Sequence, residues 1–275
     1  MASFFSLLEQ RVEDCASLLC VGLDPHLADL PAPTAEAATE FCLNLIRQTA
    51  PYAAAFKPNA AFFEQFGAAG WEALKTSIQA VQEQSHRLGS FIPVILDAKR
   101  GDIASTAEAY AQSAFQVLGA HAITLSPYLG RDSIEPFIQK PEQGVFLLCK
   151  TSNPGAGDLQ DLAVTEEPTS GLWQPLYLQV ARLAQSWNVR DNLGLVVGAT
   201  QPEALARVRA LVPEMWFLAP GIGAQGGDLE KALRAGLRSD GKGMLLPISR
   251  GISRSQNAAQ AAADFRDAIR AYARF

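Results

Sequence analysis

The sequence contains little that would indicate a secreted protein, a protein with a structural metal site or a membrane protein. It has four cysteines among 275 residues and no C-x-x-C pair, which favours buried thiols in a reducing compartment over a disulfide or metal framework. No apolar run is long enough to span a membrane, and acidic residues follow the start too soon for a signal peptide. We therefore expect a cytoplasmic protein without a membrane partner. The cysteines are Cys15, Cys20, Cys42 and Cys149.

The chain also has no excess of positive charge. Charged residues make up 19% of the chain and the net charge is −5, so the composition gives no support to a general nucleic-acid surface. A local positive pocket for a single phosphate remains compatible with this charge. The three histidines His26, His86 and His121 are not spaced as metal ligands, and we expect no metal site.

Short apolar runs alternate with longer helical patterns from one end of the chain to the other. Eight such alternations predict an α/β fold, namely a closed (β/α)₈ or TIM barrel that forms a single domain over residues 1–275. The predicted strands are Leu18–Asp24, Ala53–Asn59, the run from Phe91, Ala122–Pro127, Gly144–Thr151, Leu193–Thr200, Trp216–Pro220 and Leu245–Ser249. An opening helix is expected, and the clearest helices between and after the strands are Thr34–Thr49, Trp71–Leu88, Ser105–Leu118, Leu172–Trp187, Pro202–Leu211 and Asn257–Phe275.

One long irregular segment interrupts this rhythm. Asn153 to Gly171 follows the fifth predicted strand and is rich in Pro, Gly, Asp and Thr. A loop of this length in a compact domain is usually functional or mobile, but a neutral surface insertion fits the sequence equally well.

The third predicted strand ends abruptly in charge. Its apolar run leads into Asp97 and Lys99, with Asp102 just after Gly101. Residues two apart on an extended strand share a face, so Asp97 and Lys99 should point the same way. Gly101 should break the strand and let Asp102 turn back toward the same side. This is the carboxyl end of a parallel strand, where α/β barrels carry their catalytic residues.

The first two strands add further charges at the same end of the barrel. The first ends at Asp24 and the second at Lys57. A lone charge at a strand end is usually a solvated cap, but five charges on one face cost stability unless opposite charges and function hold them there. Carboxylates beside an ammonium group stabilise its charged form, so we expect Lys99 to act as a proton donor.

The last two strand ends have the residues of a phosphate site. A glycine-rich loop, 219–228, follows the seventh strand, and Arg250 follows the eighth. Glycines let backbone N–H groups approach an anion, and an arginine can add a bidentate contact. The loop alone could be only a tight turn. Together with Arg250, at the recurrent phosphate position of this barrel, it predicts phosphate binding.

These motifs carry a resemblance to a known family. The sequence reads F-K-P-N around Lys57, D-A-K-R-G-D-I from Asp97, T-S-N-P-G-A from Thr151 and P-G-I-G-A-Q-G-G-D from Pro220. In this combination it resembles the orotidine 5′-phosphate decarboxylase family, in particular its longer bacterial branch, from the first strand to the eighth.

The resemblance implies a reaction and a catalytic set. The reaction is the decarboxylation of orotidine 5′-phosphate (OMP) to uridine 5′-phosphate (UMP) in de novo pyrimidine biosynthesis, without a metal or organic cofactor. Lys57, Asp97, Lys99 and Asp102 match the family's charged tetrad. Lys99 matches the lysine that delivers a proton to C6 of the pyrimidine as carbon dioxide leaves.

The resemblance also implies substrate contacts and a partner. Asp24 would contact the ribose hydroxyls with Lys57, Ser152 the pyrimidine, and Gln225 and Arg250 the phosphate. The family acts as a homodimer in which Asp102, Ile103 and Thr106 reach the partner's site. The length of the loop after the fifth strand leaves open which of its residues cover the base.

Two other functions fit part of this sequence pattern. A sugar-phosphate decarboxylase or aldolase-type synthase of the same superfamily shares D-x-K-x-x-D, but it binds magnesium through an acidic residue on the second strand, where this chain has Lys57. A non-catalytic protein that binds nucleotide phosphates would bind without turnover, and the complete tetrad disfavours it.

Overall fold

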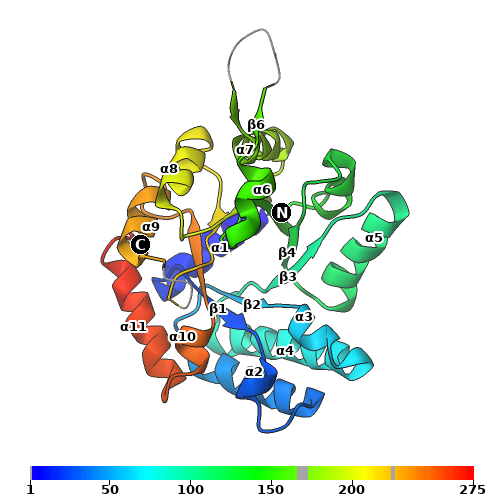
Figure 1. The fold of residues 1–275 in the computed structure, drawn as a ribbon. Coiled ribbons are helices and arrows are strands. Elements are labelled where there is room, and N and C mark those ends of the chain that lie inside the picture. Colours follow the sequence, from blue (N-terminus) through cyan, green and yellow to red (C-terminus); the bar gives the residue numbers. More distant parts are fainter. Residues whose placement is uncertain (1, 166–172, 224–226) are drawn as a thin grey trace.

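Eight parallel strands form a closed barrel in the computed structural model, which describes residues 2–165, 173–223 and 227–275 (Figure 1). The hydrogen-bonded order is β2-β1-β10-β9-β8-β5-β4-β3. Parallel bridges Phe56↔Val94 and Asn59↔Asp97 join β2 to β3 and close the ring, which confirms the predicted fold. The strands are β1 Leu19–Leu23, β2 Ala55–Pro58, β3 Ile95–Arg100, β4 Ala122–Leu125, β5 Gly144–Lys150, β8 Leu193–Val197, β9 Phe217–Leu218 and β10 Met244–Ile248.

The strands are continuous apolar runs because both of their faces are covered. Every residue of β1 and of β8 is buried, as expected for parallel strands between a packed interior and a ring of helices. Most strands are shorter than predicted, and β9 has two residues because Pro220 and Gly221 end it early. β3 ends at Arg100, directly before Gly101, where the sequence predicted the break.

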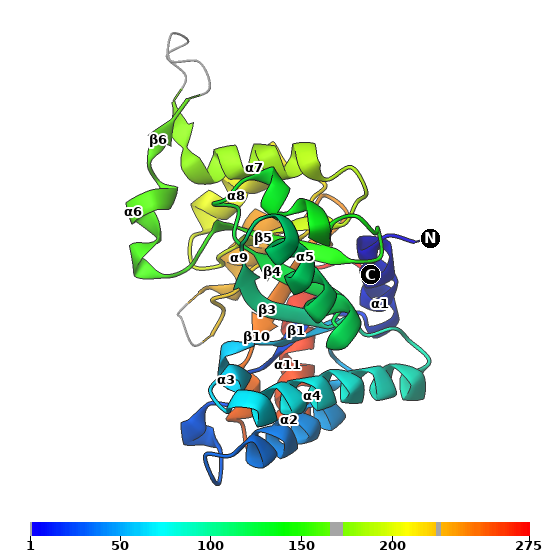
Figure 2. The ribbon, with the colours of Figure 1, turned by 90° about the vertical axis from the view of Figure 1, so that its right-hand side faces the viewer.

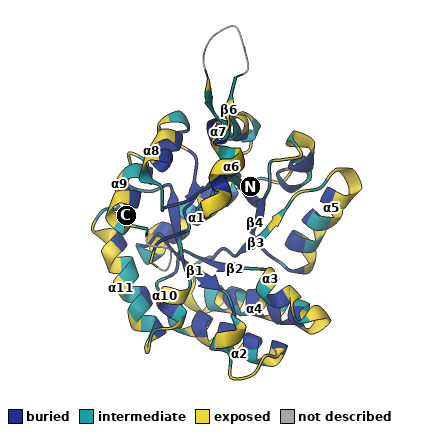
Figure 3. Ribbon diagram, in the orientation of Figure 1, coloured by how far each residue is buried: buried dark blue, intermediate teal, exposed yellow. Residues whose placement is uncertain are grey.

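Helices surround the barrel with their buried sides inward and their exposed sides outward (Figure 3). After β4 the described chain has two short 3₁₀ turns, Arg131–Ser133 and Glu135–Phe137, in place of a long helix. The helices are α1 Phe4–Cys15, α2 Ala35–Thr49, α3 Ala61–Glu64, α4 Gly67–Leu88, α5 Ala104–Gln112 with a π-helical extension Ser113–Val117, α6 Gly157–Gln160, α7 Leu176–Trp187, α8 Pro202–Leu211, α9 Leu229–Gly236, α10 Arg250–Ser253 and α11 Ala258–Arg270.

Helix α1 lies at the end of the barrel opposite α6 (Figure 2). The Phe5 ring stacks on Trp216 with centroids 6.0 Å apart and meets Phe146 edge-on at 5.7 Å. A Cβ atom on Gly144 would lie 2.4 Å from the Phe4 ring, so glycine at the start of β5 is what lets the helix approach. With this end covered by apolar side chains, the opposite end is left for the site.

The segment after β5 is more ordered than predicted. It contains a 3₁₀ turn Pro154–Ala156, the short helix α6 and strand β6 Ala163–Val164, which pairs antiparallel with β7 Gln174–Pro175. Helix α7 therefore begins at Leu176. The predicted loop end at Gly171 and the predicted helix start at Leu172 lie outside the described residues.

Three of the four cysteines are buried and all four are free. Burial raises the pKa of Cys20 and of Cys42 to about 12, so both thiols stay protonated and behave as small apolar side chains. Within the described ranges, no helix is long and apolar enough to cross a membrane.

Candidate active site

A cavity of about 620 Å³ lies at the carboxyl ends of the strands. Of the ten residues that the sequence singled out, six line it. They lie within β2 and β3 or just after β1, β5 and β10, so the closed barrel brings together positions that are far apart in the chain. The six are Asp24, Lys57, Asp97, Lys99, Ser152 and Arg250.

Asp97 is the centre of the charged group. Its Oδ2 lies 2.7 Å from Lys57 Nζ and its Oδ1 lies 2.5 Å from Lys99 Nζ. The Lys57 and Asp97 side chains are 9% and 11% exposed, whereas the Lys99 side chain is 50% exposed. Lys99 is therefore the member of this group that a bound molecule can reach most easily.

The two lysines keep Asp97 ionised. Burial alone would raise the pKa of Asp97, but the charges of Lys57 and Lys99 and their hydrogen bonds outweigh it and lower the pKa far below its usual range. For Lys57 burial acts to lower the pKa, yet the charges of Asp97 and Asp24 raise it well above its ordinary value. Both groups of the buried pair are thus charged at neutral pH.

Thr124 on β4 holds the Asp97–Lys99 turn in place. Its hydroxyl accepts from the backbone N–H groups of Ala98 and Lys99, at 3.1 and 2.9 Å, and donates to Asp97 Oδ1 at 3.1 Å. Lys99 has φ 50°, and the β3–β4 register shifts between Leu96 and Arg100. The strand is therefore bulged here, not extended as predicted, and this side-chain contact supports the unusual backbone. A lone threonine within a buried apolar strand was the sequence signal for this residue.

Asp24 carries an unpaired acceptor. Its Oδ1 is buried and has no hydrogen-bond partner among the described residues. Gly22, two residues earlier, lets β1 lie close to the end of β10, because a Cβ atom there would be 2.7 Å from Ser249 Cβ. A buried carboxylate oxygen without a donor beside a cavity is suited to accept a ligand hydroxyl.

Three predicted residues lie away from this cavity. Asp102 does not turn back toward it; its Oδ1 accepts from the backbone N–H of Ile103 at 2.8 Å. The Ile103 side chain is exposed, and Thr106 is exposed on the first turn of α5. Within one chain, the structure brings together Asp24, Lys57, Asp97 and Lys99 but not Asp102.

The glycine-rich loop after β9 is closed at its base. Gly227 N–H donates to Gly221 O at 3.0 Å, and a Cβ atom on Gly227 would lie 2.6 Å from that oxygen. Gly221 has φ 117°, a conformation that favours glycine. Arg250 and Gly221 both line the cavity, whereas Gln225 lies outside the described residues.

The cavity has further lining residues that the sequence reasoning did not assign to it. The His26 ring packs edge-on against Phe62 with centroids 4.2 Å apart, and both line the cavity. Gln160 of α6 also lines it, and its amide bonds to both the backbone N–H and the hydroxyl of Thr151, each at 2.9 Å. His26 lies in a loop and Gln160 at the end of the short helix α6, and the sequence alone does not show which way either side chain points.

Among the described residues, no group of three or more His, Cys, Asp or Glu side chains is arranged to hold a metal ion. His121 has a structural role: its Nδ1 accepts from Val94 N–H at 3.0 Å, and burial lowers its pKa to about 4. The imidazole is therefore neutral at physiological pH.

Comparison with known proteins identifies the family. The model of the orotidine 5′-phosphate decarboxylase / HUMPS family matches residues 17–265. The chain belongs to this family. Orotidine 5′-phosphate decarboxylases of Roseiflexus castenholzii and Thermomicrobium roseum are each 48% identical to it. The alignments cover 98% and 99% of this chain and 95% and 92% of the two relatives.

Solved structures of the family have the same barrel. Leishmania donovani OMP decarboxylase is 55% identical with a TM-score of 0.87, and the match covers 98% of each chain. Leishmania donovani UMP synthase is 56% identical with a TM-score of 0.88, and this chain covers 57% of its length. The three relatives of similar length named above thus carry the decarboxylase name, not that of a sugar-phosphate synthase.

Proposed function

We propose that this chain, which acts as an orotidine 5′-phosphate decarboxylase, uses Lys99 to protonate C6 of the pyrimidine as carbon dioxide leaves. The observation that carries the proposal is the half-exposed Lys99 ammonium group, held against the buried Asp97–Lys57 pair at the wall of the cavity. Of the two lysines, Lys99 is the one placed to meet a substrate.

The charges fit this division of roles. Asp97 has a strongly lowered pKa and accepts from three donors, so it cannot supply a proton. Lys57 is buried and has a raised pKa, which suits it to hold Asp97 rather than to release a proton. Lys99 places a cation where negative charge would develop on C6, and the same ammonium group can then donate its proton.

The remaining substrate contacts are proposed from the cavity and the family resemblance. Asp24, with its unpaired oxygen, would accept from the ribose hydroxyls, and Ser152 would contact the base. Arg250 and Gln225 would bind the phosphate. Phosphate binding far from C6 can supply energy for closing the site over the base.

We further propose a cytoplasmic homodimer in which each chain, as one domain over residues 1–275, lends three residues to its partner. Asp102, Ile103 and Thr106 lie outside their own cavity, and Ile103 is 51% exposed, which leaves them free to reach another chain. The free cysteines suit a reducing compartment.

A direct assay tests the proposed function. Purified protein is mixed with OMP and a metal chelator, and the ultraviolet absorbance of the substrate is followed. We expect complete consumption of OMP and formation of UMP at an undiminished rate. Absence of turnover would count against the proposal and in favour of a non-catalytic nucleotide-phosphate binding protein. A strict requirement for magnesium would favour a metal-dependent sugar-phosphate enzyme.

A further inference from the structure

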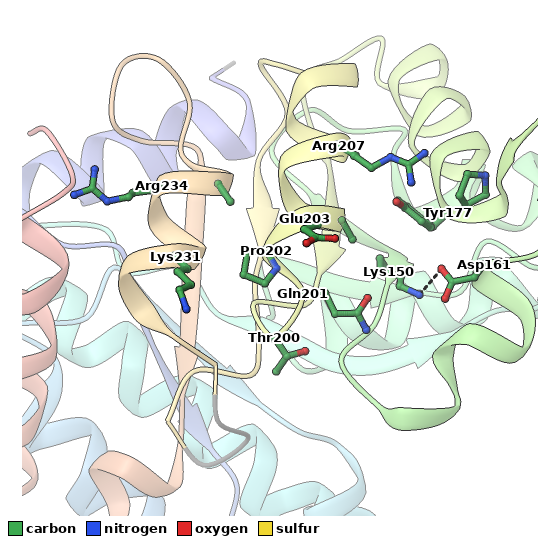
Figure 4. Close-up of a pocket in the computed structure, with 13 residues that line it drawn as sticks. Lys150, Asp161, Tyr177, Thr200, Gln201, Pro202, Glu203, Arg207, Lys231 and Arg234 are labelled. Carbon is green, nitrogen blue, oxygen red and sulfur yellow. Dashed lines mark hydrogen bonds and ion pairs between the residues drawn. The ribbon is translucent and has the colours of Figure 1, made fainter.

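A second and larger cavity lies outside the barrel, beside α7, α8 and α9 (Figure 4). Its volume is about 1010 Å³, and it shares no lining residue with the active-site cavity. Lys150, the last residue of β5, projects into it beside Asp161 (Figure 4). The short segment between these two residues separates one cavity from the other.

A bulge at the end of β5 directs Lys150 into this outer cavity. Leu148 lines the active-site cavity, and on a regular strand Lys150 would share its face. The β5–β8 register shifts between Leu148 and Lys150, however, and a bulge of this kind re-aims the side chains that follow it. Lys150 therefore lines the outer cavity, whereas the next residues, Thr151 and Ser152, line the active site.

Lys150 makes an ion pair that ties α6 to the barrel. Lys150 is 2% exposed, and its Nζ lies 2.7 Å from Asp161 Oδ1 and 5.5 Å from the centre of the Tyr177 ring. A buried ammonium group is costly unless it is paired, so the pair strongly favours the conformation in which Asp161 stays beside Lys150. Asp161 directly follows the last residue of α6.

The same segment is fixed on its other side, inside the active site. Gln160, the neighbour of Asp161, makes two hydrogen bonds to Thr151, the neighbour of Lys150. Two neighbouring pairs therefore join the two ends of this segment. Lys150 and Asp161 face the outer cavity, whereas Thr151 and Gln160 face the active site. Ser152, the next residue after Thr151, also lines the active site.

We propose that Lys150 is a positioning residue that acts through its ion pair with Asp161. The pair holds the 151–160 segment in place, and this segment forms the wall of the substrate cavity against which the base binds. The inference rests on the proposed function, because it takes Ser152 and Gln160 to face the pyrimidine. The phosphate end of the cavity, at Arg250, is formed by other elements and does not depend on this ion pair.

The test compares a ligand that has a base with one that lacks it. Lys150→Met keeps the length of the side chain and removes its charge, and Asp161→Asn keeps the shape of the partner. For each variant we expect the Kd of UMP, and the KM of OMP, to rise about tenfold or more because the wall is displaced. The Kd of ribose 5-phosphate should change by less than about twofold, since this ligand lacks the base. The Kd of UMP for the double variant should be no higher than that of the weaker-binding single variant, because both substitutions break the same ion pair.

Arg207→Met is the matched control, because Arg207 is a cation of the same cavity that also lies over the Tyr177 ring, at 5.8 Å. Equal losses for UMP and ribose 5-phosphate, or effects no larger than those of Arg207→Met, would overturn the proposal. If Lys150→Met does not fold, Asp161→Asn decides, since that side chain is 52% exposed. A wild-type chain that binds UMP but does not consume OMP would overturn the proposed function alone.

Discussion

Lys57 Nζ lies 2.7 Å from Asp97 Oδ2, with both side chains about nine-tenths buried. Removal of one partner from a buried ion pair leaves an uncompensated charge and typically costs about 3–5 kcal/mol. In this chain the pair also sets the position of Lys99, because Asp97 binds both ammonium groups. Stability and catalysis therefore depend on the same carboxylate.

The pH dependence of unfolding tests the charge of Asp97. Its folded pKa lies below the unfolded value of about 3.9, so it contributes stability that is present above about pH 4 and is lost as the pH falls toward the folded pKa. The difference in free energy of unfolding between wild type and Asp97→Asn should hold its value from about pH 5 to neutral pH and shrink below about pH 4. Asp132→Asn, at an exposed site, should show no such change. A difference that grows toward acid pH would contradict the assignment.

Thr124→Val removes the hydroxyl that supports the Lys99 backbone. The two N–H groups of Ala98 and Lys99 lose their acceptor, so we expect a loss of about 1–3 kcal/mol in the free energy of unfolding. Misplacement of Lys99 should lower kcat about tenfold or more with a smaller effect on KM. Thr76→Val, on the exposed face of α4, is the control for both denaturation and kinetics. Unchanged kcat in Thr124→Val would show that this contact is not needed.

Arg250→Ala tests the phosphate end of the cavity. Loss of a charge-assisted contact worth about 1.5–3 kcal/mol should weaken UMP binding about 10- to 100-fold, and uridine binding should not change. Arg254→Ala removes a cation from the residue that follows the same short helix, where it pairs with Asp29. Calorimetric titration of both variants with UMP and uridine distinguishes the effect of removing Arg250 from that of removing Arg254. Equal weakening for both ligands would contradict a phosphate contact at Arg250.

Mixing two inactive chains tests the shared site. Lys99→Ala and Asp102→Asn should each be inactive alone, yet their heterodimer would contain one site with both residues intact. We expect activity to reappear as subunits exchange, up to about a quarter of the wild-type rate at equal mixing, because half of the dimers are mixed and each has one good site. If heterodimers are shown to form and activity does not return, Asp102 does not serve the partner.

The barrel could be predicted from the sequence because its strands are apolar runs separated by helical patterns. Some strand ends were less accurate, since proline and glycine after β9 shorten that strand to two residues, whereas β3 ends at Arg100, directly before the predicted break at Gly101. The alternation rule placed Asp97 and Lys99 on one face, and the structure does join them, but through a bulge with φ 50° at Lys99. A bulge depends on the neighbouring strand, here on Thr124, and a local pattern does not contain that information.

In the candidate site, too, the sequence predicted which residues lie at the strand ends but not the direction of side chains that depend on tertiary contacts. The five charged residues at the ends of the first three strands were evident from position alone, and the barrel brings four of them, together with Arg250, to one cavity. Asp102 was expected to turn toward that cavity, and instead its Oδ1 accepts from the backbone N–H of Ile103. His26, Gln160 and Lys150 were missed because the direction of a loop or post-bulge side chain is set by tertiary contacts, not by spacing.

The most direct measurement of the central claim is the single-turnover rate of Lys99→Ala with OMP, beside its affinity for UMP. The account predicts a rate lowered by at least about 10³-fold, because both the stabilising cation and the proton donor are lost, with UMP affinity within about tenfold of wild type. A rate within about tenfold of wild type would contradict the assignment of Lys99 as the proton donor.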